Sequence, residues 1–487
     1  MKLSKIFEKA PDIEVDALIT DSRTQTKHGM FFCLDGLNNN GHRFIPQAIK
    51  NGAICIVHSE PLETYRDGVT YIKVENVEKT LTRVVNIFYD TPSRNLKVFG
   101  VTGTNGKSTV TNIISDIYNH FESCGYIGTI AIRYNDINLP PDLTTPNPIY
   151  LNDILSQMVA AKVKAVALEV SSHGLELGRV DTIDFDCAIF TNFTYDHLDF
   201  HGSMENYFNA KKKLFVNMKE DGISILNKDD PKYLALASAC NTRIVTYGIE
   251  SEADYRADNI QLFTKYSLFT LIHKGKQYEI KTNLVAMYNI YNLISAMAAL
   301  VENGFTLEEI IPFVGNIKQI EGRMESVDEG QPFQVIVDFA HTPDGLEKVY
   351  QYAKDITPEG SDIITVFGSA GKRDTAKRKV FGKIADEYCD YIILTEDDPR
   401  DEDPKEIADQ IREGIQNTNT VFIENRYDAI RMAIESANVH DTIMILGKGD
   451  EEFMYREEGR APWLGDNKAA KEIIHKYYLG EEMDEIE

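Results

Sequence analysis

A glycine-rich loop that ends on a lysine and a serine carries the residue types that bind nucleoside triphosphates. Its residues are Gly103, Thr104, Asn105, Gly106, Lys107, Ser108 and Thr109. Backbone N–H groups of such a loop can surround phosphate oxygens, a lysine ammonium can neutralise them, and a serine hydroxyl can ligate Mg²⁺. The loop departs from the strict G-x-x-x-x-G-K-[ST] pattern, because Val101 replaces the first glycine. We predict phosphate binding here, with Lys107 on the β- and γ-phosphates; the alternative is a turn that only precedes a helix.

The segments on either side of this loop predict the elements that position it. Leu96, Val98 and Gly100 belong to an alternating apolar run typical of a strand. After the loop, apolar residues recur at helical spacing from Val110 to Phe121. A strand, a glycine loop and a helix in this order place the helix N-terminus against an anion.

Three further residue types could complete a phosphate-transfer site. Glu169 ends an apolar strand, and a carboxylate beside a triphosphate is a hard ligand for Mg²⁺. His197 lies in Tyr-Asp-His-Leu-Asp, and Lys211 opens a run of three lysines. Each has a simpler interpretation: a structural ion pair for Glu169, a loop hydrogen bond for His197 and a solvated helix face for Lys211.

Six polar clusters follow directly after apolar strands between residue 96 and the C-terminus. They are SSHG after VALEV, TYDHLD after AIFTNF, AHTPDG after VIVDF, SAGKRD after IITVFG, EDDPR after YIILT, and GKGDEE after TIMIL. Ligands in open α/β sheets bind outside the carboxyl ends of the strands. We therefore predict a ligand site along these edges.

The composition restricts the class of protein. The chain has 487 residues with 51 basic and 76 acidic side chains, for a net charge of -25. Such a surface repels nucleic acid, so we expect no nucleic-acid partner, and acidic substrates would need local basic loops. No apolar run approaches a membrane span and the N-terminus lacks a signal-peptide pattern, so we expect a cytoplasmic protein without a membrane partner.

The chain divides into three sections, which we predict to be domains: residues 1–95, 96–320 and 321–487. The first contains short strands at 53–57 and 69–74 and a polar turn at 35–41. The third alternates strands at 334–339, 363–367, 391–395 and 442–446 with helices that include 344–356 and 404–415. This alternation predicts an α/β fold with a mostly parallel sheet. The acidic tail at 480–487 is expected to be a solvated end.

Long motifs along the chain resemble one family. They are DSR at residue 21, GVTGTNGKST, TTPNP, LEVSSHGLELGRV, TNFTYDHLDFHGSMENYFNAKKKLF, EGRMESV, VDFAHTPDGL, FGSAGKRD and DDPRDEDP, in this order. Together they resemble the Mur ligases of bacterial cell-wall synthesis, and among these the ligases that add the third residue of the peptide. The resemblance implies a UDP-sugar-binding first section, a P-loop-type ATPase in the centre and a Rossmann-like, amino-acid-binding third section.

The resemblance also implies a role for each matching residue. Those that match positions contacting ATP are Gly103, Thr104, Asn105, Gly106, Lys107, Ser108, Thr109, Asn289, Asn292, Arg323, Asp338 and His341. Ser22, His42, Thr144, Thr145, Ser172 and Arg179 match positions for the substrate UDP-N-acetylmuramoyl-L-alanyl-D-glutamate. Lys107, Glu169, His197 and Lys211 match catalytic positions, and Ser108, Glu169, His197 and Lys211 match those around Mg²⁺. Lys211, in the family pattern A-K-x-x-L-F, resembles a lysine that CO₂ converts into a carbamate, whose anionic oxygen suits Mg²⁺ better than an ammonium.

The incoming amino acid is less well defined. Asp397, Asp398, Arg400, Gly447 and Glu451 match the family's amino-acid-binding positions. Arg400 favours meso-diaminopimelate, because a guanidinium can bind the second carboxylate of this diamino acid through two hydrogen bonds. Asp398 stands where the family usually has asparagine, and an aspartate at 450 where it often has histidine, so L-lysine is the alternative. Arg400 could also pair only with Asp401 or Asp403 at the surface.

Other functions remain possible on the sequence alone. A non-catalytic nucleotide-binding module would share the phosphate loop, but it would not need Glu169, His197 and Lys211 together. A folylpolyglutamate synthetase should lack the first section and the SSHGLELGR segment. A degenerate paralog, or a divergent one with another acceptor, is possible because Ser369-Ala370-Gly371-Lys372 departs from the family pattern. We expect a monomer.

Overall fold

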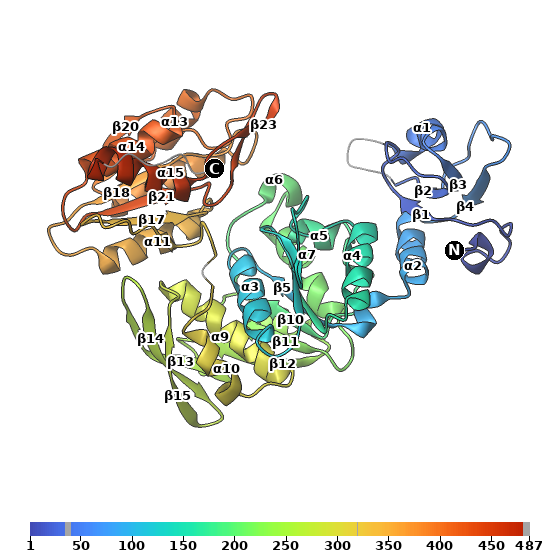
Figure 1. Cartoon of the computed structure of the whole chain (residues 1–487), viewed down its shortest axis with the longest axis horizontal. Coiled ribbons are helices and arrows are strands. Elements are labelled where there is room, and N and C mark those ends of the chain that lie inside the picture. The colour runs from blue at the N-terminus through green and yellow to red at the C-terminus, as the bar shows by residue number, and fades with distance from the viewer. Residues whose placement is uncertain (35–39, 319, 481–487) are drawn as a thin grey trace.

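The computed structural model describes residues 1–34, 40–318 and 320–480. Most of the predicted 35–41 turn and nearly all of the acidic tail at 480–487 lie outside the described residues. The strands within this part of the chain form three principal sheets, which Figure 1 shows as three separate bodies. None of the helices within these ranges is both long enough and apolar enough to cross a bilayer.

The first section forms a small parallel sheet in the order β1-β2-β3-β4. Its elements are β1 (Ala17–Ile19), β2 (Gly29–Phe32), α1 (Ile45–Lys50), β3 (Ala53–His58), β4 (Thr70–Lys73) and α2 (Val77–Tyr89). Helix α2 covers one face of the sheet and contacts α4 (Pro148–Ala160) of the central section. This sheet therefore stands at one end of the molecule, beside the central sheet (Figure 1).

The central section has eleven strands in the order β15-β14-β13-β12-β11-β10-β5-β9-β6-β7-β8. The strands are β5 (Lys97–Thr102), β6 (Cys124–Ile127), β7 (Ile132–Tyr134), β8 (Ile137–Leu139), β9 (Ala165–Glu169), β10 (Cys187–Phe190), β11 (Ile223–Asn227), β12 (Arg243–Gly248), β13 (Tyr255–Leu262), β14 (Ser267–His273) and β15 (Lys276–Thr282). Strands β5, β6 and β9 to β13 form the parallel part, and antiparallel strands extend it at both edges.

Helices cover both faces of this central sheet. They are α3 (Lys107–Tyr118), α4, α5 (Ser172–Glu176), α6 (Leu198–His201), α7 (Met204–Val216), α8 (Tyr233–Ala237), α9 (Met287–Glu302) and α10 (Leu307–Val314). Apolar residues of α3, α9 and α10 form the core on one face, and those of α4 and α7 form the core on the other. Burial on both faces explains why these strands are nearly continuous apolar runs.

The third section has a six-stranded sheet in the order β16-β17-β21-β18-β19-β20, parallel except for β16. Its elements are β16 (Glu325–Ser326), β17 (Gln334–Asp338), α11 (Pro343–Ile356), β18 (Ile363–Phe367), α12 (Ala376–Tyr388), β19 (Tyr391–Leu394), α13 (Pro404–Arg412), β20 (Asn419–Phe422), α14 (Arg426–Ser436), β21 (Thr442–Leu446) and α15 (Asp466–Ile473). Strands β22 (Phe453–Arg456) and β23 (Gly459–Pro462) pair in a separate hairpin. The predicted α/β fold is confirmed.

Two predicted helices are shorter than expected. Helix α3 ends at Tyr118 rather than at Phe121, because the Asn119 side chain bonds to the backbone of Ser115 and Cys124 and turns the chain into β6. Phe121 instead packs against Phe305 and Phe313. Helix α13 ends at Arg412 rather than at residue 415.

Candidate active site

A cavity of about 580 Å³ lies where the strand ends of the central and third sections face each other. All six polar clusters predicted from the sequence contribute side chains to its lining. The predicted site residues that line it are Thr104, Asn105, Gly106, Lys107, Ser108, Thr109, Thr144, Glu169, Ser172, Arg179, His197, Lys211, Asn289, Asn292, Arg323, Asp338, His341, Asp397, Asp398, Arg400, Gly447 and Glu451. Gly103, Thr145, Ser22 and His42 are not part of the lining.

The phosphate loop connects β5 to α3 in a conformation that requires glycine. Gly106 has a φ of +86°, and a Cβ at this position would lie 2.4 Å from Oδ1 of Asn292. The loop therefore approaches α9 more closely than any larger residue would allow. The Lys107 ammonium donates hydrogen bonds to the carbonyl oxygens of Gly103 (3.1 Å) and Thr104 (2.8 Å). Burial lowers the pKa of Lys107, while the carboxylates of Glu169 and Asp196 oppose this effect.

Glu169 is fully buried at the end of β9, and its carboxylate accepts four hydrogen bonds. Tyr126 Oη (2.7 Å) and Thr129 N (3.0 Å) donate to Oε1. Ser108 Oγ (2.9 Å) and Thr129 Oγ1 (3.2 Å) donate to Oε2. These hydrogen bonds join Ser108 of the phosphate loop to the end of β9. They also place the Glu169 carboxylate, an anionic group, beside the loop.

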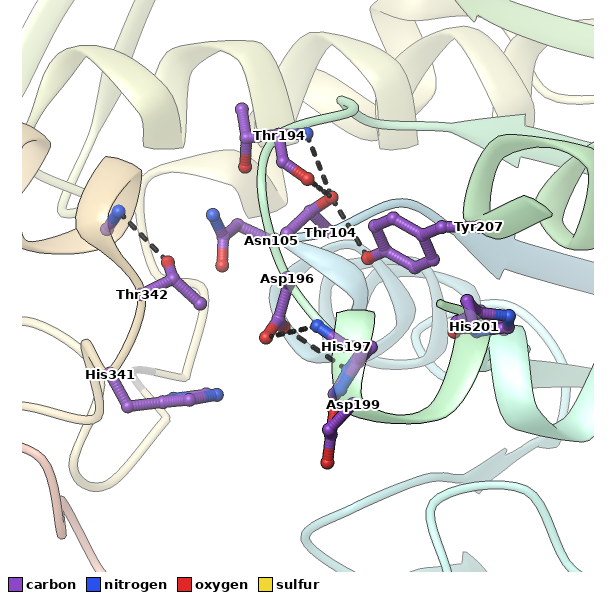
Figure 2. Close-up of polar contacts among 12 residues, drawn as sticks. Thr104, Asn105, Thr194, Asp196, His197, Asp199, His201, Tyr207, His341 and Thr342 are labelled. Atoms are coloured by element: carbon purple, nitrogen blue, oxygen red, sulfur yellow. Dashed lines mark hydrogen bonds and ion pairs between the residues drawn. The ribbon is translucent and has the colours of Figure 1, made fainter. Parts of the chain in front are cut away.

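His197 lies at the start of α6 with a φ of +54°, and Asp196 holds it in place. Asp196 accepts a hydrogen bond from the His197 backbone (2.8 Å), and its other oxygen lies 3.2 Å from Nε2 (Figure 2). Burial lowers the pKa of His197 to about 3, although Asp196 opposes the shift. The imidazole is therefore neutral at physiological pH, as a metal ligand must be. Asp196 was not predicted, although it adjoins His197 within the same motif.

Lys211 of α7 is buried, and its ammonium donates a 2.7 Å hydrogen bond to the Gly103 carbonyl. It also lies 4.6 Å from the centre of the Tyr207 ring. Burial, reinforced by the Lys107 ammonium, holds the pKa of Lys211 well below its usual value, and Asp196 opposes this. A lowered pKa favours the neutral amine, which is the form that reacts with CO₂.

The side chains beside the phosphate loop include oxygen donors that suit Mg²⁺. No group of three or more His, Cys, Asp or Glu side chains with metal-binding geometry occurs in the described part of the chain. The Ser108 hydroxyl and the Glu169 carboxylate are hard oxygen donors of the kind that Mg²⁺ prefers, and they lie in contact with each other. Because Mg²⁺ usually completes its shell with water and phosphate oxygens, this pair fits the ion. The Lys211 ammonium does not fit it, whereas a carbamate would.

The residues predicted to contact the nucleotide come from two sections. Asn289 and Asn292 of α9 are joined by a 3.0 Å hydrogen bond. Asp338, at the end of β17, accepts hydrogen bonds from the backbones of Met324 and Ala340 (both 2.8 Å), and burial raises its pKa. The Arg323 guanidinium lies 4.4 Å from the Phe339 ring centre.

His341 faces Asp196 and His197 from the opposite side of the cavity (Figure 2). Burial lowers the pKa of His341 to about 4, although Asp196 opposes the shift.

The residues predicted to contact the muramoyl peptide form a group beside Glu169. Thr145 is buried behind the cavity and donates to the Glu169 carbonyl (2.8 Å). Arg179 Nη1 donates to the Thr145 carbonyl (3.0 Å), and Ser172 Oγ lies 3.0 Å from His201 Nε2. Thr144 Oγ1 lies 3.1 Å from Thr129 Oγ1, within hydrogen-bond distance.

Ser22 and His42 lie in the first section, apart from this cavity. The Ser22 carbonyl accepts a hydrogen bond from Asn51 (2.8 Å). His42 Nε2 accepts hydrogen bonds from the backbones of Ser59 (3.2 Å) and Glu60 (3.3 Å). The structure therefore does not bring these two residues to the phosphate loop.

The part of the cavity lining that comes from the third section includes Asp398 and Arg400, in the loop after β19. Asp398 accepts a 2.8 Å hydrogen bond from the buried Lys448 ammonium, which also pairs with Glu451. Arg400 Nη1 donates to the Gly371 carbonyl (2.5 Å). The surface pairs with Asp401 or Asp403 are not among the ion pairs of the described residues: Asp401 pairs with Lys372, and Asp403 caps α13.

Asp397, the neighbour of Asp398, packs closely against Gly447. A Cβ added at Gly447 would lie 2.4 Å from the Asp397 carboxylate. Burial raises the pKa of both Asp397 and Glu451, although the Lys448 ammonium opposes the shift in each case. These carboxylates and Lys448 form one compact charge cluster.

Comparisons with known proteins identify the family. Residues 14–89 match the Mur ligase family catalytic domain, residues 101–300 the Mur ligase middle domain, and residues 322–449 the Mur ligase glutamate ligase domain. A protein from Fusobacterium nucleatum subsp. nucleatum, named UDP-N-acetylmuramoyl-L-alanyl-D-glutamate--2,6-diaminopimelate ligase, is 39% identical over 474 residues, covering 96% of this chain and 95% of the relative. The chain belongs to the Mur ligase family.

Two more relatives support the assignment. A Clostridium acetobutylicum protein, named as ligase 1 of the same kind, is 38% identical over 98% of this chain and 99% of its own length. A solved structure described as UDP-N-acetylmuramoyl-L-alanyl-D-glutamate--2,6-diaminopimelate ligase has a TM-score of 0.69 at 26% identity, covering 98% of this chain and 99% of that one. The matches include the first section, which argues against a folylpolyglutamate synthetase.

Several residues that line this Mur ligase cavity or contact its lining were not predicted from the sequence. Lys377 of α12 lines it and donates to the His341 carbonyl (3.1 Å). Its only signal was its position just after the SAGKRD cluster. Tyr126 and Tyr455 contact Glu169 and Arg400, but they lie on strands without any local motif. Their partners are distant in sequence, so spacing could not reveal them.

Proposed function

We propose that this Mur ligase uses ATP to join a diamino acid, with meso-diaminopimelate favoured, to UDP-N-acetylmuramoyl-L-alanyl-D-glutamate in peptidoglycan precursor synthesis. The observation that carries the proposal is one cavity whose lining includes the phosphate loop of the central section together with Arg400 and Glu451 of the third section. The printed names of the full-length relatives describe the same reaction. The chemistry follows from what an amide-forming reaction requires.

A carboxylate does not condense with an amine in water, because oxide is a very poor leaving group. In the proposed reaction, the γ-carboxylate of D-glutamate attacks the γ-phosphorus of ATP, which forms an acyl phosphate and releases ADP. The neutral amine of the diamino acid then attacks the acyl carbon. The tetrahedral species collapses, phosphate leaves with the bonding electrons, and the ammonium proton passes to solvent.

The residues around the phosphate loop act on the first step. We assign Lys107 to the transferring phosphate, where an ammonium offsets the developing charge. Ser108, Glu169, His197 and a carbamylated Lys211 would surround Mg²⁺. When bound, Mg²⁺ supplies charge neutralisation and a fixed orientation for the phosphates. Gly103 to Thr109 would bind the phosphates, and Asn289, Asn292, Arg323, Asp338 and His341 would bind the rest of the nucleotide.

The position of the cavity between two sections serves the second step. An acyl phosphate hydrolyses if water reaches it, so the two sheets must enclose the reacting groups. Asn105 of the phosphate loop already donates a 2.9 Å hydrogen bond to Asp344 of α11. Tyr195 likewise donates to Asp374 (2.7 Å). These contacts hold the two sections together around the cavity.

We propose domains at 1–95, 96–320 and 321–487, with UDP bound near Ser22 and His42 in the first. Thr144, Thr145, Ser172 and Arg179 would hold the peptide end of that substrate beside Glu169. A single chain supplies both ends of the cavity, so the proposal requires only a monomer. We place the enzyme in the cytoplasm.

The charged groups around Arg400 favour diaminopimelate over L-lysine. Asp398 replaces the usual asparagine, but its carboxylate pairs with the Lys448 ammonium, which it shares with Glu451, and not with Arg400. Arg400 is therefore left as a cation that can bind a second carboxylate, and Glu451 can bind an ammonium. L-Lysine would place no carboxylate against Arg400.

The test is ADP release from purified protein with Mg²⁺, ATP and UDP-N-acetylmuramoyl-L-alanyl-D-glutamate. Parallel reactions contain meso-diaminopimelate, L-lysine, L-ornithine or no amino acid, and product masses are measured. Turnover with diaminopimelate alone supports the proposal. A preference for L-lysine would retain the mechanism and overturn the amino acid. No amino-acid-dependent turnover would favour a degenerate or divergent paralog.

A further inference from the structure

The β22–β23 hairpin lies outside the six-stranded sheet, yet it contributes Tyr455 to the cavity lining. Both backbone groups of Tyr455 bind the loop that carries Arg400. Its N–H donates to the Asp398 carboxylate (2.9 Å), and its carbonyl accepts from the Arg400 N–H (2.9 Å). The hairpin is thus attached to the loop on both sides of Pro399.

The loop needs this attachment because its backbone is strained. Asp398 has a φ of +47° and Arg400 a φ of +55°, values that side-chain-bearing residues rarely adopt. Such conformations persist only where the surroundings determine them. The two hydrogen bonds to Tyr455 help to hold the loop in this conformation. A further contact joins Arg456 of the hairpin to Glu396 at 2.7 Å.

The side chain of Tyr455 makes a separate contact with Arg400. The Arg400 guanidinium lies 5.3 Å from the centre of the Tyr455 ring, within the range of a cation–π interaction. The Tyr455 hydroxyl accepts a 3.0 Å hydrogen bond from Arg460 Nε, which fixes the ring from the solvent side. The Gly371 carbonyl accepts a hydrogen bond from Nη1 of the same guanidinium.

These two contacts leave the guanidinium positioned but not neutralised. Arg400 takes part in no ion pair among the described residues, and its partners are a carbonyl oxygen and an aromatic ring. A guanidinium held by neutral partners keeps its charge and its remaining N–H groups for an anion. The carboxylates nearest to Arg400 along the chain are engaged elsewhere: Asp401 pairs with Lys372, and Asp398 pairs with Lys448.

We propose that Tyr455 is a positioning residue for amino-acid selection: its ring orients Arg400 toward the distal carboxylate of the incoming diamino acid. This inference rests on the proposed function, because it needs a substrate with a second carboxylate. The backbone bonds of Tyr455 do not depend on its side chain and would survive substitution by any residue except proline, so the inference concerns the ring alone. Loss of the ring should weaken binding of the amino acid without changing ATP use.

The experiment compares Tyr455→Ala, Tyr455→Leu and Tyr455→Phe with the unsubstituted enzyme in the ADP-release assay. Loss of one cation–π contact predicts an increase of about 3- to 30-fold in KM for meso-diaminopimelate. The values of kcat and KM for ATP should stay within about twofold. Tyr455→Phe keeps the ring and should restore most of the affinity. Tyr455→Leu keeps the side-chain bulk and replaces the alanine variant if that variant does not fold.

A double-mutant cycle with Arg400→Ala separates positioning from general packing. If Tyr455 acts through Arg400, Tyr455→Ala should add almost nothing once Arg400 is removed. Full additivity, an unchanged KM for diaminopimelate in the leucine variant, or equal losses in KM for ATP would each overturn the inference. If the unsubstituted enzyme used L-lysine instead of diaminopimelate, the choice of amino acid and this inference would both fail. If it used diaminopimelate and the variants behaved like it, only this inference would fail.

Discussion

Replacing Glu169 by glutamine tests whether the buried carboxylate beside the phosphate loop serves Mg²⁺–ATP. Glutamine has almost the same shape. Its amide oxygen can accept from Tyr126 and from the Thr129 backbone, while its NH₂ group can donate to the hydroxyls of Ser108 and Thr129. The substitution therefore removes the negative charge and preserves the packing.

The expected magnitude follows from this geometry. Each of the four hydrogen bonds loses its charge assistance, which costs about 1 kcal/mol per bond. Neutralising a buried carboxylate removes a desolvation penalty of several kcal/mol, which offsets that loss. We therefore expect little change in the melting temperature without ligand. Loss of an anionic ligand should weaken Mg²⁺–ATP binding by about 100-fold and lower kcat by ~10²–10³-fold.

Thermal unfolding with and without Mg²⁺–ATP measures the binding effect directly. At a ligand concentration of about 100 times Kd, binding stabilises the unsubstituted enzyme by about 2.7 kcal/mol. A 100-fold weaker variant at the same concentration gains only about 0.4 kcal/mol. The ligand-induced rise in Tm should therefore almost disappear, in parallel with ADP release.

Tyr126→Phe is the matched control. It removes one hydrogen bond to Glu169 and leaves both the charge and the aromatic ring, so its effect on activity should be within about tenfold. A Glu169→Gln variant with an undiminished response to Mg²⁺–ATP would refute the role of the carboxylate. Equal losses in both variants would show that the hydrogen-bond network matters and the charge does not.

Three further predictions concern other parts of the cavity. Lys211→Ala should abolish activity without rescue by bicarbonate, and mass spectrometry of the native protein should show one added CO₂; undiminished turnover would contradict this. Arg400→Ala should raise KM for meso-diaminopimelate about 10- to 100-fold, as for a lost charge-assisted pair, and an unchanged KM would remove Arg400 from recognition. Because burial lowers the pKa of His341 to about 4, below its usual 6.5, the unfolded state binds the proton more readily. Stability should therefore decline as pH falls from 6.5 toward 4, and His341→Gln should reduce that slope in thermal unfolding.

The sequence predicted the elements whose signals are local. Strands Ile363–Phe367 and Thr442–Leu446 were predicted with the bounds that the structure shows, because each is a continuous apolar run. The gathering of six strand-end clusters at one cavity followed from the rule for parallel sheets. Helix ends were predicted less well, because the residue that ends α3 does so through contacts with the next strand.

The parts that could not be predicted depend on partners far apart in the chain. Nothing in the sequence around Asp398 shows that it pairs with Lys448, so the sequence alone leaves L-lysine as an alternative. Tyr126 and Tyr455 occupy ordinary strand positions, and only the fold brings them to Glu169 and Arg400. Periodicity and spacing describe neighbours along the chain, whereas these contacts are set by sheet order.

The charge distribution reconciles an acidic protein with anionic substrates. The chain carries a net charge of -25, yet at least as many lysines and arginines as aspartates and glutamates line the cavity. Cations stand at two places where the proposed substrates are most negative: Lys107 at the phosphate loop and Arg400 in the loop after β19. The field of the remaining surface repels polyanions such as nucleic acids, which cannot enter a cavity of this size. Small anions reach local cations that a large anion cannot, so the same fold can reject one class and bind the other.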